Sequence, residues 1–232
     1  MNSYYSNVYW HFTGSPEGID WHSVRSPNEI IKNGPPKNDN EAWAIFQKII
    51  ESEVLLAKST ELIIQGVSTD EFCCVTDIPI QNLHEHCKYY GNVCIGFHPV
   101  PIHACFCPVL YISPNSLPAI AIYPNEEEME KHYVPEEIHN WNYTTSGKTK
   151  FDLGRLDKAF INHIKITRFS PEPGESFYRE REWRRITNFY FKMSDIACVI
   201  VPRSYVHKTY KVLNSKNAYD IPVIPWELLR EI

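Results

Sequence analysis

The sequence is poor in glycine, with Gly 9 among 232 residues, and it has no glycine pattern of the Walker or Rossmann type. A phosphate cradle built from such a loop is therefore not expected. Long apolar runs are also missing, because no stretch approaches the roughly 18 apolar residues of a membrane-spanning helix. No basic segment followed by an apolar one opens the chain, as a signal peptide would. We expect a soluble, cytoplasmic protein without a membrane partner.

An excess of basic residues is missing as well. The formal net charge is −5 and the pI is near 6.1, so no overall positive field attracts nucleic acid. A basic nucleic-acid-binding protein is therefore not expected. A local patch of arginines keeps a nucleic-acid substrate open: Arg179, Arg181, Arg184 and Arg185.

The cysteines do not form an even set, and several of the seven lie in apolar, strand-like runs. Such cysteines are typical of reduced thiols in a cytoplasm. One Cys/His group invites a zinc hypothesis: His84, His86, Cys87, His103, Cys105 and Cys107. No Cys-x-x-Cys or spaced His pair in it matches a structural zinc pattern, so we expect no metal. A nucleophilic Cys73 or Cys74 beside Asp77 would need a positioned histidine.

The remaining composition is ordinary for a globular protein, with 43% hydrophobic and 22% charged residues. The length suits one large core, and no repeat or linker divides the chain, so we expect a single domain over residues 1–232. The 17 prolines cut the chain into short elements. The 14 tyrosines, 11 phenylalanines and 6 tryptophans indicate a core or a cleft rich in rings.

Apolar spacing predicts one long helix from residue 41 to about 65, with Asp39 or Asn40 as N-cap. Shorter helices are predicted near 28–32, 78–89, 125–133 and 203–213. Strands are predicted over 7–13, 72–76, 92–97, 108–112, 160–169, 182–187 and 196–201, with an extended tail at 221–226. Helices thus fall mainly in the N-terminal half. We predict an α+β fold in which they pack on a mixed, largely antiparallel sheet of short strands.

Two polar runs are candidates for chemistry. In the first, His11 and Thr13 are two residues apart and share a face if the segment is a strand, where both could hydrogen-bond a ligand sugar. A buried histidine satisfied by its surroundings is the alternative. In the second, residues 176–185, Glu182 and Arg184 share a face while Trp183 points into the core. A carboxylate flanked by guanidiniums stays ionised and stabilises developing positive charge, unless the run is an exposed salt-bridge ladder.

Several runs, in this order, resemble the abortive-infection AbiGi-type family: His11-Phe12-Thr13, Phe72-Cys73-Cys74-Val75-Thr76-Asp77-Ile78-Pro79, Tyr90-Gly91-Asn92-Val93-Cys94-Ile95-Gly96-Phe97 and Arg179-Glu180-Arg181-Glu182-Trp183-Arg184. The later Val199-Ile200-Val201-Pro202 and Ile224-Pro225-Trp226-Glu227 look similar too. The resemblance implies a component of a phage-resistance system, labelled an antitoxin, with a toxin or a phage component as protein partner.

A more distant resemblance concerns ADP-ribosyltransferases of the DarT type, which modify DNA. It is carried by the histidine–hydroxyl pair, the run Pro108-Val109-Leu110-Tyr111, and the glutamate before an aromatic residue. It implies an ADP-ribosyltransferase-like fold and NAD as substrate. By this resemblance, Glu182 and His11 are the catalytic residues: His11 holds the NAD ribose, and Glu182 orients the ribose 2′-hydroxyl and stabilises the oxocarbenium-like transition state.

The same resemblance assigns further NAD-binding residues. Thr13 would assist His11, Tyr90 or Tyr111 would pack on the nicotinamide, and Arg184 would belong to the site. Arg25 is the candidate for the arginine that DarT-type enzymes place in the NAD site. Three hypotheses stay open: NAD cleavage that modifies a protein or a nucleic acid or depletes NAD, a non-catalytic antitoxin or sensor, and a metal-dependent nuclease.

Overall fold

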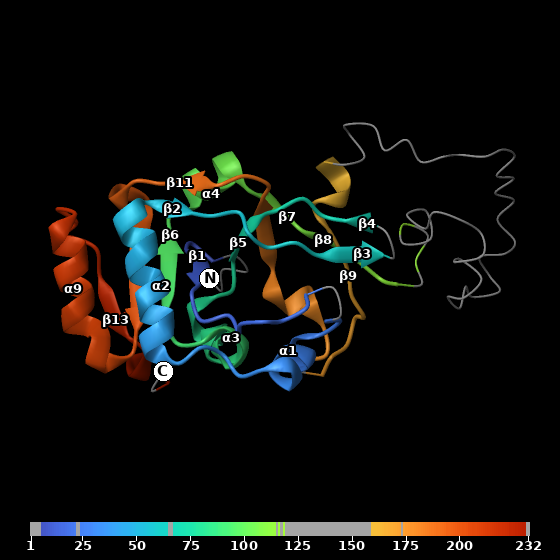
Figure 1. Ribbon diagram of the computed structural model, residues 1–232, viewed down its shortest axis with the longest axis horizontal. Coiled ribbons are helices and arrows are strands. Elements are labelled where there is room, and N and C mark those ends of the chain that lie inside the picture. The colour runs from blue at the N-terminus through green and yellow to red at the C-terminus, as the bar shows by residue number, and fades with distance from the viewer. Residues whose placement is uncertain are drawn as a thin grey trace, which may run out of the picture.

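The computed structural model describes residues 6–21, 24–64, 67–114, 116, 118, 159–172 and 174–230. Its centre is a seven-stranded sheet with the strand order β13-β12-β6-β1-β5-β10-β7 (Figure 1). All neighbouring strands run antiparallel except β12 and β13, which run parallel. The strands are β1 (Tyr9–Phe12), β5 (Cys73–Thr76), β6 (Cys94–Phe97), β7 (Cys107–Pro108), β10 (Glu182–Arg185), β12 (Ile196–Val201) and β13 (Val223–Pro225).

Three two-stranded sheets flank the main one: β2 (Val54–Leu55) with β11 (Phe189–Tyr190), β3 (Leu62–Ile64) with β4 (Val67–Ser68), and β8 (Leu110–Ile112) with β9 (Ile164–Ile166). The helices are α1 (Pro27–Asn33), α2 (Asp39–Ser52), α3 (Leu83–Tyr90), α4 (Pro99–Cys105) and α9 (Val206–Ser215). Short 3-10 turns lie at Ile80–Asn82, Phe177–Glu180, Met193–Asp195, Arg203–Tyr205 and Trp226–Arg230. The predicted α+β class and the largely antiparallel sheet are confirmed.

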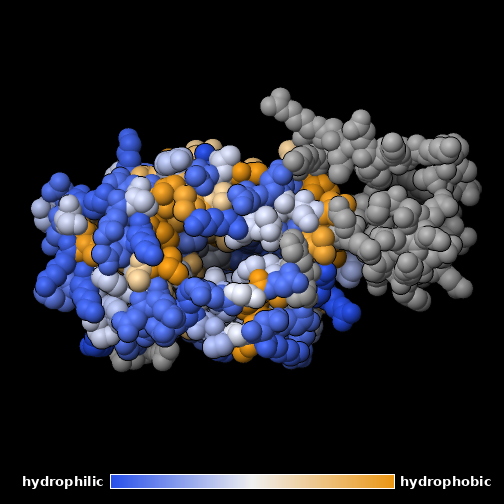
Figure 2. Space-filling model, viewed as in Figure 1, coloured by the Kyte–Doolittle hydropathy of each residue, from blue (hydrophilic) through white to orange (hydrophobic). Residues whose placement is uncertain are grey.

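The main sheet is buried on both faces, and its side chains alternate between two apolar clusters. Ile95 of β6 packs in the same cluster as Phe46 of α2 and Leu213 of α9. Cys94, one residue earlier, packs with Leu83 of α3 in the other cluster. Since successive side chains of a strand point to opposite faces, α2 and α9 cover one face and α3 lies on the other (Figure 1). The outer surfaces of α2 and α9 are mostly hydrophilic, as Figure 2 shows.

The predicted helix over 41–65 exists but is wrong at its end, and its N-cap is Asn38, since Asp39 and Asn40, the predicted caps, lie in the first turn of the helix. Asn38 caps α2 through a capping box with Glu41. The helix ends at Ser52 because Glu53 adopts a left-handed conformation, with φ 54° and ψ 38°. The residues after it pair as strands, and Leu55 of β2 lies opposite Phe189 of β11. Tertiary pairing therefore overrides the helical spacing of the apolar residues beyond 53.

Two further predictions need correction, and one element was not predicted. The strand predicted over 108–112 is divided between β7 and β8, and the one predicted over 160–169 is confined to 164–166. The helix α4 begins with Pro99, where a proline costs no hydrogen bond because the first turn has no internal acceptor. The acidic helix predicted at 125–133 lies outside the described residues.

A charged cluster between two cavities

The β10 strand presents a polar pair on one face of the sheet. Glu182 lies opposite Thr76 of β5, and Thr76 lies opposite Trp10 of β1, so all three share a face. Arg184 is two residues further along β10 and points the same way. Trp183, between them, contacts the ring of Tyr9 in the apolar cluster of the other face. The predicted placement of Glu182 and Arg184 on one face is the observed one, whereas Trp183 is partly buried, packing against the apolar cluster and lining the larger cleft.

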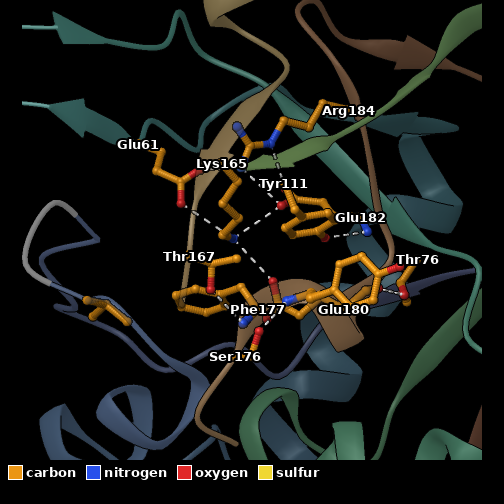
Figure 3. Close-up of polar contacts among 12 residues, drawn as sticks. Glu61, Thr76, Tyr111, Lys165, Thr167, Ser176, Phe177, Glu180, Glu182 and Arg184 are labelled. Carbon is orange, nitrogen blue, oxygen red and sulfur yellow. Dashed lines mark hydrogen bonds and ion pairs between the residues drawn. The ribbon is translucent and has the colours of Figure 1, made fainter. Parts of the chain in front are cut away.

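A buried lysine joins the carboxylates of this face. Lys165 comes from β9, and its Nζ lies 3.2 Å from Oε2 of Glu182, 3.1 Å from Oε2 of Glu180 and 3.4 Å from Oε1 of Glu61 (Figure 3). The ammonium also lies 4.1 Å from the centroid of the Phe177 ring. These four polar residues and Arg184 form one network, which we call the charged cluster.

Arg184 is the most deeply buried member of the charged cluster, with 0% of its surface exposed. Its Nε and Nη2 donate to the two carboxylate oxygens of Glu182 at 2.9 and 3.0 Å, and Nη2 also pairs with Glu61. The guanidinium lies over the ring of Phe72, 4.3 Å from its centroid. A two-pronged pair of this kind fixes both the charge and the orientation of the carboxylate.

The backbone between Glu180 and Glu182 makes a left-handed turn. Arg181 has φ 47° and ψ 49°, a left-handed conformation that costs a residue other than glycine about 1–2 kcal/mol. The turn joins the end of the 3-10 segment Phe177–Glu180 to the start of β10, and the two carboxylates on either side of it reach the same ammonium. The Arg181 guanidinium pairs with both oxygens of the buried Asp77, which holds this conformation in place.

The two glutamates differ in their affinity for a proton. Burial favours the neutral form of Glu182, but Arg184 and Lys165 outweigh it and lower the pKa of Glu182 to about 2. Burial raises the pKa of Glu180 above its ordinary value, and Glu182 adds to that effect while Lys165 and the Tyr90 hydroxyl oppose it. Glu182 is therefore a permanent anion near neutral pH, and Glu180 is the member of the pair that takes up a proton first. Neighbouring carboxylates with such different environments are typical of acid–base sites.

The charged cluster separates two cavities. The larger is a cleft of about 1000 Å³ lined by residues that include Asp77, Tyr111, Tyr178 and Trp183. The smaller has a volume of about 160 Å³ and is walled largely by rings, those of Trp10, Phe12, Trp21, Phe72 and Tyr90. Three residues line both cavities: His86, Glu180 and Glu182. A ligand can therefore meet these carboxylates from either side.

Two histidines face the smaller cavity in their neutral form. The Nδ1–H of His11 donates to the backbone carbonyl of Cys74 at 2.9 Å, and burial lowers the pKa of His11 despite that bond. Burial lowers the pKa of His86 to about 3, with Glu182 opposing the shift. The ring of His86 packs against those of Phe12 and Tyr90, with centroid distances of 4.8 and 4.5 Å. Neither imidazole thus adds a positive charge near neutral pH.

The structure brings together some of the residues expected to form the site. His11, Tyr90 and Glu182 line the smaller cavity, although they come from distant parts of the sequence. Tyr111 lines the larger cleft, and its hydroxyl oxygen accepts a hydrogen bond from the backbone N–H of Glu182 at 2.8 Å. Two expected binding residues line neither cavity. Arg184 donates hydrogen bonds to Glu182, and the Thr13 hydroxyl donates to the backbone carbonyl of Ala42 at 2.8 Å. Arg25 lines neither cavity and donates to a neighbouring carbonyl.

The sequence did not single out Glu180, Lys165 or Glu61 as site residues. Glu180 lies in the polar run that contains Glu182, and its half-buried tyrosine partner, Tyr90, is distant in sequence. Lys165 has a signal that could have identified it, namely a lysine between two isoleucines of a strand that is otherwise apolar. Glu61 carries no local signal, because its place is set by tertiary contacts alone.

The thiols near the cluster are poor nucleophiles. Burial raises the pKa of Cys73 to about 12, and it raises that of Cys74 well above its ordinary value, with Glu182 adding to the effect. Reactive cysteines require the opposite shift. Within the described ranges, no group of three or more His, Cys, Asp or Glu side chains is arranged to hold a metal ion. No described helix is long and apolar enough to cross a membrane.

The fold and the site define an α+β protein with a buried cluster of three carboxylates and two cations between two cavities. Residues 46–224 match the family model described as "Putative abortive phage resistance protein AbiGi, antitoxin", and the chain belongs to this AbiGi family. The matched region contains the charged cluster and begins after His11 and Thr13. No curated protein and no solved structure matches the chain.

Proposed function

We propose that this AbiGi-family protein acts in phage defence by binding NAD and cleaving its nicotinamide–ribose bond. The observation that supports this proposal is the meeting of His11 and Glu182 at one cavity walled by aromatic rings. Cleavage of this bond builds positive charge on the ribose, and a preformed anion in a dry pocket stabilises such charge. The products would be nicotinamide and an ADP-ribosyl group carried to water or to a macromolecule.

The charge balance of the site favours a cationic reacting centre. The charged cluster has three carboxylates against two cations, which leaves one negative charge when all are ionised. His11 and His86 are neutral near physiological pH and offset none of it. The positive nicotinamide ring and the oxocarbenium-like ribose would both meet a net negative wall. In this arrangement Glu182 is the stabilising anion, and Arg184 and Lys165 hold its orientation.

The aromatic residues supply the remaining features that the reaction needs. Tyr90 lies at the wall of the smaller cavity, where its ring can pack on the nicotinamide, and its hydroxyl donates to Glu180. His11 has Nε2 left as a hydrogen-bond acceptor for a ribose hydroxyl, because Nδ1–H is engaged by Cys74. Tyr111 lies on the larger cleft, from which an acceptor would approach.

The test is to incubate the purified protein with NAD and to measure free nicotinamide and ADP-ribosylated protein or nucleic acid by mass spectrometry. We expect Glu182→Gln to reduce nicotinamide release by roughly 100- to 1,000-fold, which is the usual effect of removing a charge-stabilising group. Glu51→Gln, at an exposed position of α2, is the matched control and should retain full release. Thermal unfolding of each variant separates lost chemistry from lost folding. Absence of release by the wild-type protein, alone and in phage-infected cells, would rule the proposal out.

A second candidate is a non-catalytic antitoxin that binds a protein toxin, because the family description names an antitoxin. In that case the protein should co-purify with a toxin encoded beside it and neutralise that toxin. Glu182→Gln would then leave neutralisation intact provided that the variant folds. Loss of neutralisation in a folded Glu182→Gln protein would count against a purely scaffolding role.

A further inference from the structure

His86 lies between the two cavities. It is one of the three residues that line both cavities, and the other two are the carboxylates Glu180 and Glu182. Its ring is held on two sides by the rings of Phe12 and Tyr90. Among the described residues, neither ring nitrogen has a hydrogen-bond partner, unlike those of His11 and His84. The orientation of the imidazole is thus fixed by packing, and within the part of the chain that the structure describes its nitrogens make no hydrogen bond.

The volume of the smaller cavity limits what can enter it. At about 160 Å³ it is close to the roughly 150 Å³ of a cavity that holds one benzene molecule. A single six-membered ring therefore fits, and a purine with its sugar does not. Five Trp, Phe and Tyr rings and two imidazoles line the cavity, and such rings favour a flat ligand. Three carboxylates line it, those of Glu61, Glu180 and Glu182, against the ammonium of Lys165, and this excess of negative groups favours a ligand that carries positive charge.

We propose that the smaller cavity takes a single cationic heteroaromatic ring bearing an amide group, and that His86 is the residue that binds and orients the amide. This inference rests on the proposed function. It adds a binding residue and a predicted order of affinity among related ligands. A neutral imidazole has one donor nitrogen and one acceptor nitrogen on different sides of the ring, so the nitrogen that faces the ligand can bind either the C=O or the NH₂ of a carboxamide. The low pKa of His86 keeps both roles available near neutral pH.

This assignment predicts selection between related ligands. An oxidised nicotinamide ring carries the positive charge that the carboxylates favour, whereas the reduced ring of NADH does not. Replacement of the amide by a carboxylate would place a like charge beside Glu180 and Glu182 and remove the donor that matches the acceptor of His86. The order of affinity should therefore be oxidised amide, then reduced amide, with the acid form weakest.

The experiment is calorimetric titration of the full-length protein with carba-NAD, a non-cleavable analogue with an oxidised nicotinamide ring, and with NADH. We expect His86→Phe, which keeps a ring between Phe12 and Tyr90, to weaken carba-NAD binding roughly tenfold, as one lost hydrogen bond would. His86→Asn restores a donor and an acceptor and should recover part of the affinity. His84→Phe, on the same helix and outside both cavities, should bind as the wild type does.

The outcomes separate this inference from the proposed function. If carba-NAD binds in preference to NADH and depends on His86, but NAD is never cleaved, the inference stands and the proposed reaction fails. If NAD is cleaved while His86→Phe binds carba-NAD as tightly as the wild type, the reaction stands and the inference fails. A wild-type protein that binds no carba-NAD, or prefers NADH, overturns the inference without any variant.

Discussion

The ammonium of Lys165 bridges Glu180 and Glu182, lying 3.1 Å from Oε2 of the first and 3.2 Å from Oε2 of the second. This bridge makes the cluster a single electrostatic unit, because each glutamate depends on the same cation. Taking charged groups out of water is costly, and such a network is stable only while its partners are complete. The stability of the fold and the chemistry of the site therefore share one residue.

Removing that bridge should destabilise the protein strongly. Lys165→Met leaves three buried carboxylates facing Arg184 alone, and we expect the free energy of unfolding to fall by about 3–5 kcal/mol. Urea unfolding measures the change. Lys211→Met, at an exposed position of α9, is the control and should change the free energy by less than about 0.5 kcal/mol. Equal effects of the two substitutions would show that the cluster is not buried in solution.

Acid should weaken the fold partly through His86. Its pKa is about 3 in the folded protein and 6.5 ordinarily, so the unfolded chain binds the proton more readily. The stabilising contribution is complete above about pH 6.5 and is lost as the pH falls toward 3. Glu180, with its raised pKa, acts in the opposite direction, and Glu182 loses its contribution only below its ordinary pKa.

The contribution of His86 is isolated by a difference measurement. As the pH is lowered from about 7 to about 4, the free energy of unfolding should decrease less steeply for His86→Phe than for the wild type. The carboxylates and His11 are present in both proteins, so their contributions cancel to first order. Urea unfolding at several pH values gives the two slopes. Parallel slopes would contradict a neutral, buried His86.

A glycine at the rim of the larger cleft should tolerate no side chain. Gly174 has φ +78°, and a methyl group there would overlap Oδ1 of Asn28 and the Tyr89 hydroxyl. Gly18 has a similar φ of +70° with nothing within 4 Å. Gly18→Ala should therefore cost about 1 kcal/mol from the backbone alone, and Gly174→Ala about 1–3 kcal/mol more from overlap. Thermal or urea unfolding tests the difference, and equal costs would mean that the Gly174 loop does not pack on α1 and α3.

The cysteines should differ widely in reactivity toward iodoacetamide. Cys107 is exposed, whereas Cys73 is buried and burial raises its pKa to about 12. Because the thiolate is the reactive form, the native protein should be labelled at Cys107 well before Cys73 or Cys74. Peptide mass spectrometry over a time course gives the order. Early labelling of Cys74 would indicate that the strand carrying it opens readily.

The sequence allowed most of the sheet to be predicted, because its strands carry local signals. The strands β5, β6 and β12 are short apolar runs bounded by turn residues, and each lies within or at the predicted range. The end of α2 could not be predicted, since the apolar spacing continues past Ser52 and only the left-handed Glu53 and the pairing of β2 end it. The ADP-ribosyltransferase-like fold stays a prediction, because no solved structure matches the chain.

The site was partly predictable for the same reason. Glu182 and Arg184 stand two apart in a polar run, so their shared face follows from strand geometry alone. Their partners Glu61 and Lys165 come from β-strand regions far along the chain, and no local pattern states which distant residues will meet. The left-handed Arg181 was equally hidden, because a charged residue at that position carries no conformational signal. The roles assigned to His11, Thr13, Tyr90 and Tyr111 stay predictions.

The partition formed by His86, Glu180 and Glu182 has a consequence for any pair of ligands. A cation bound in one cavity would favour the ionised form of Glu180, and this carboxylate also lines the other cavity. A ligand bound in one cavity thus changes the affinity of the other cavity for its own ligand. Thermodynamic linkage requires this effect to be equal in both directions. Two ligands bound in the two cavities would therefore alter each other's affinity through Glu180, without direct contact.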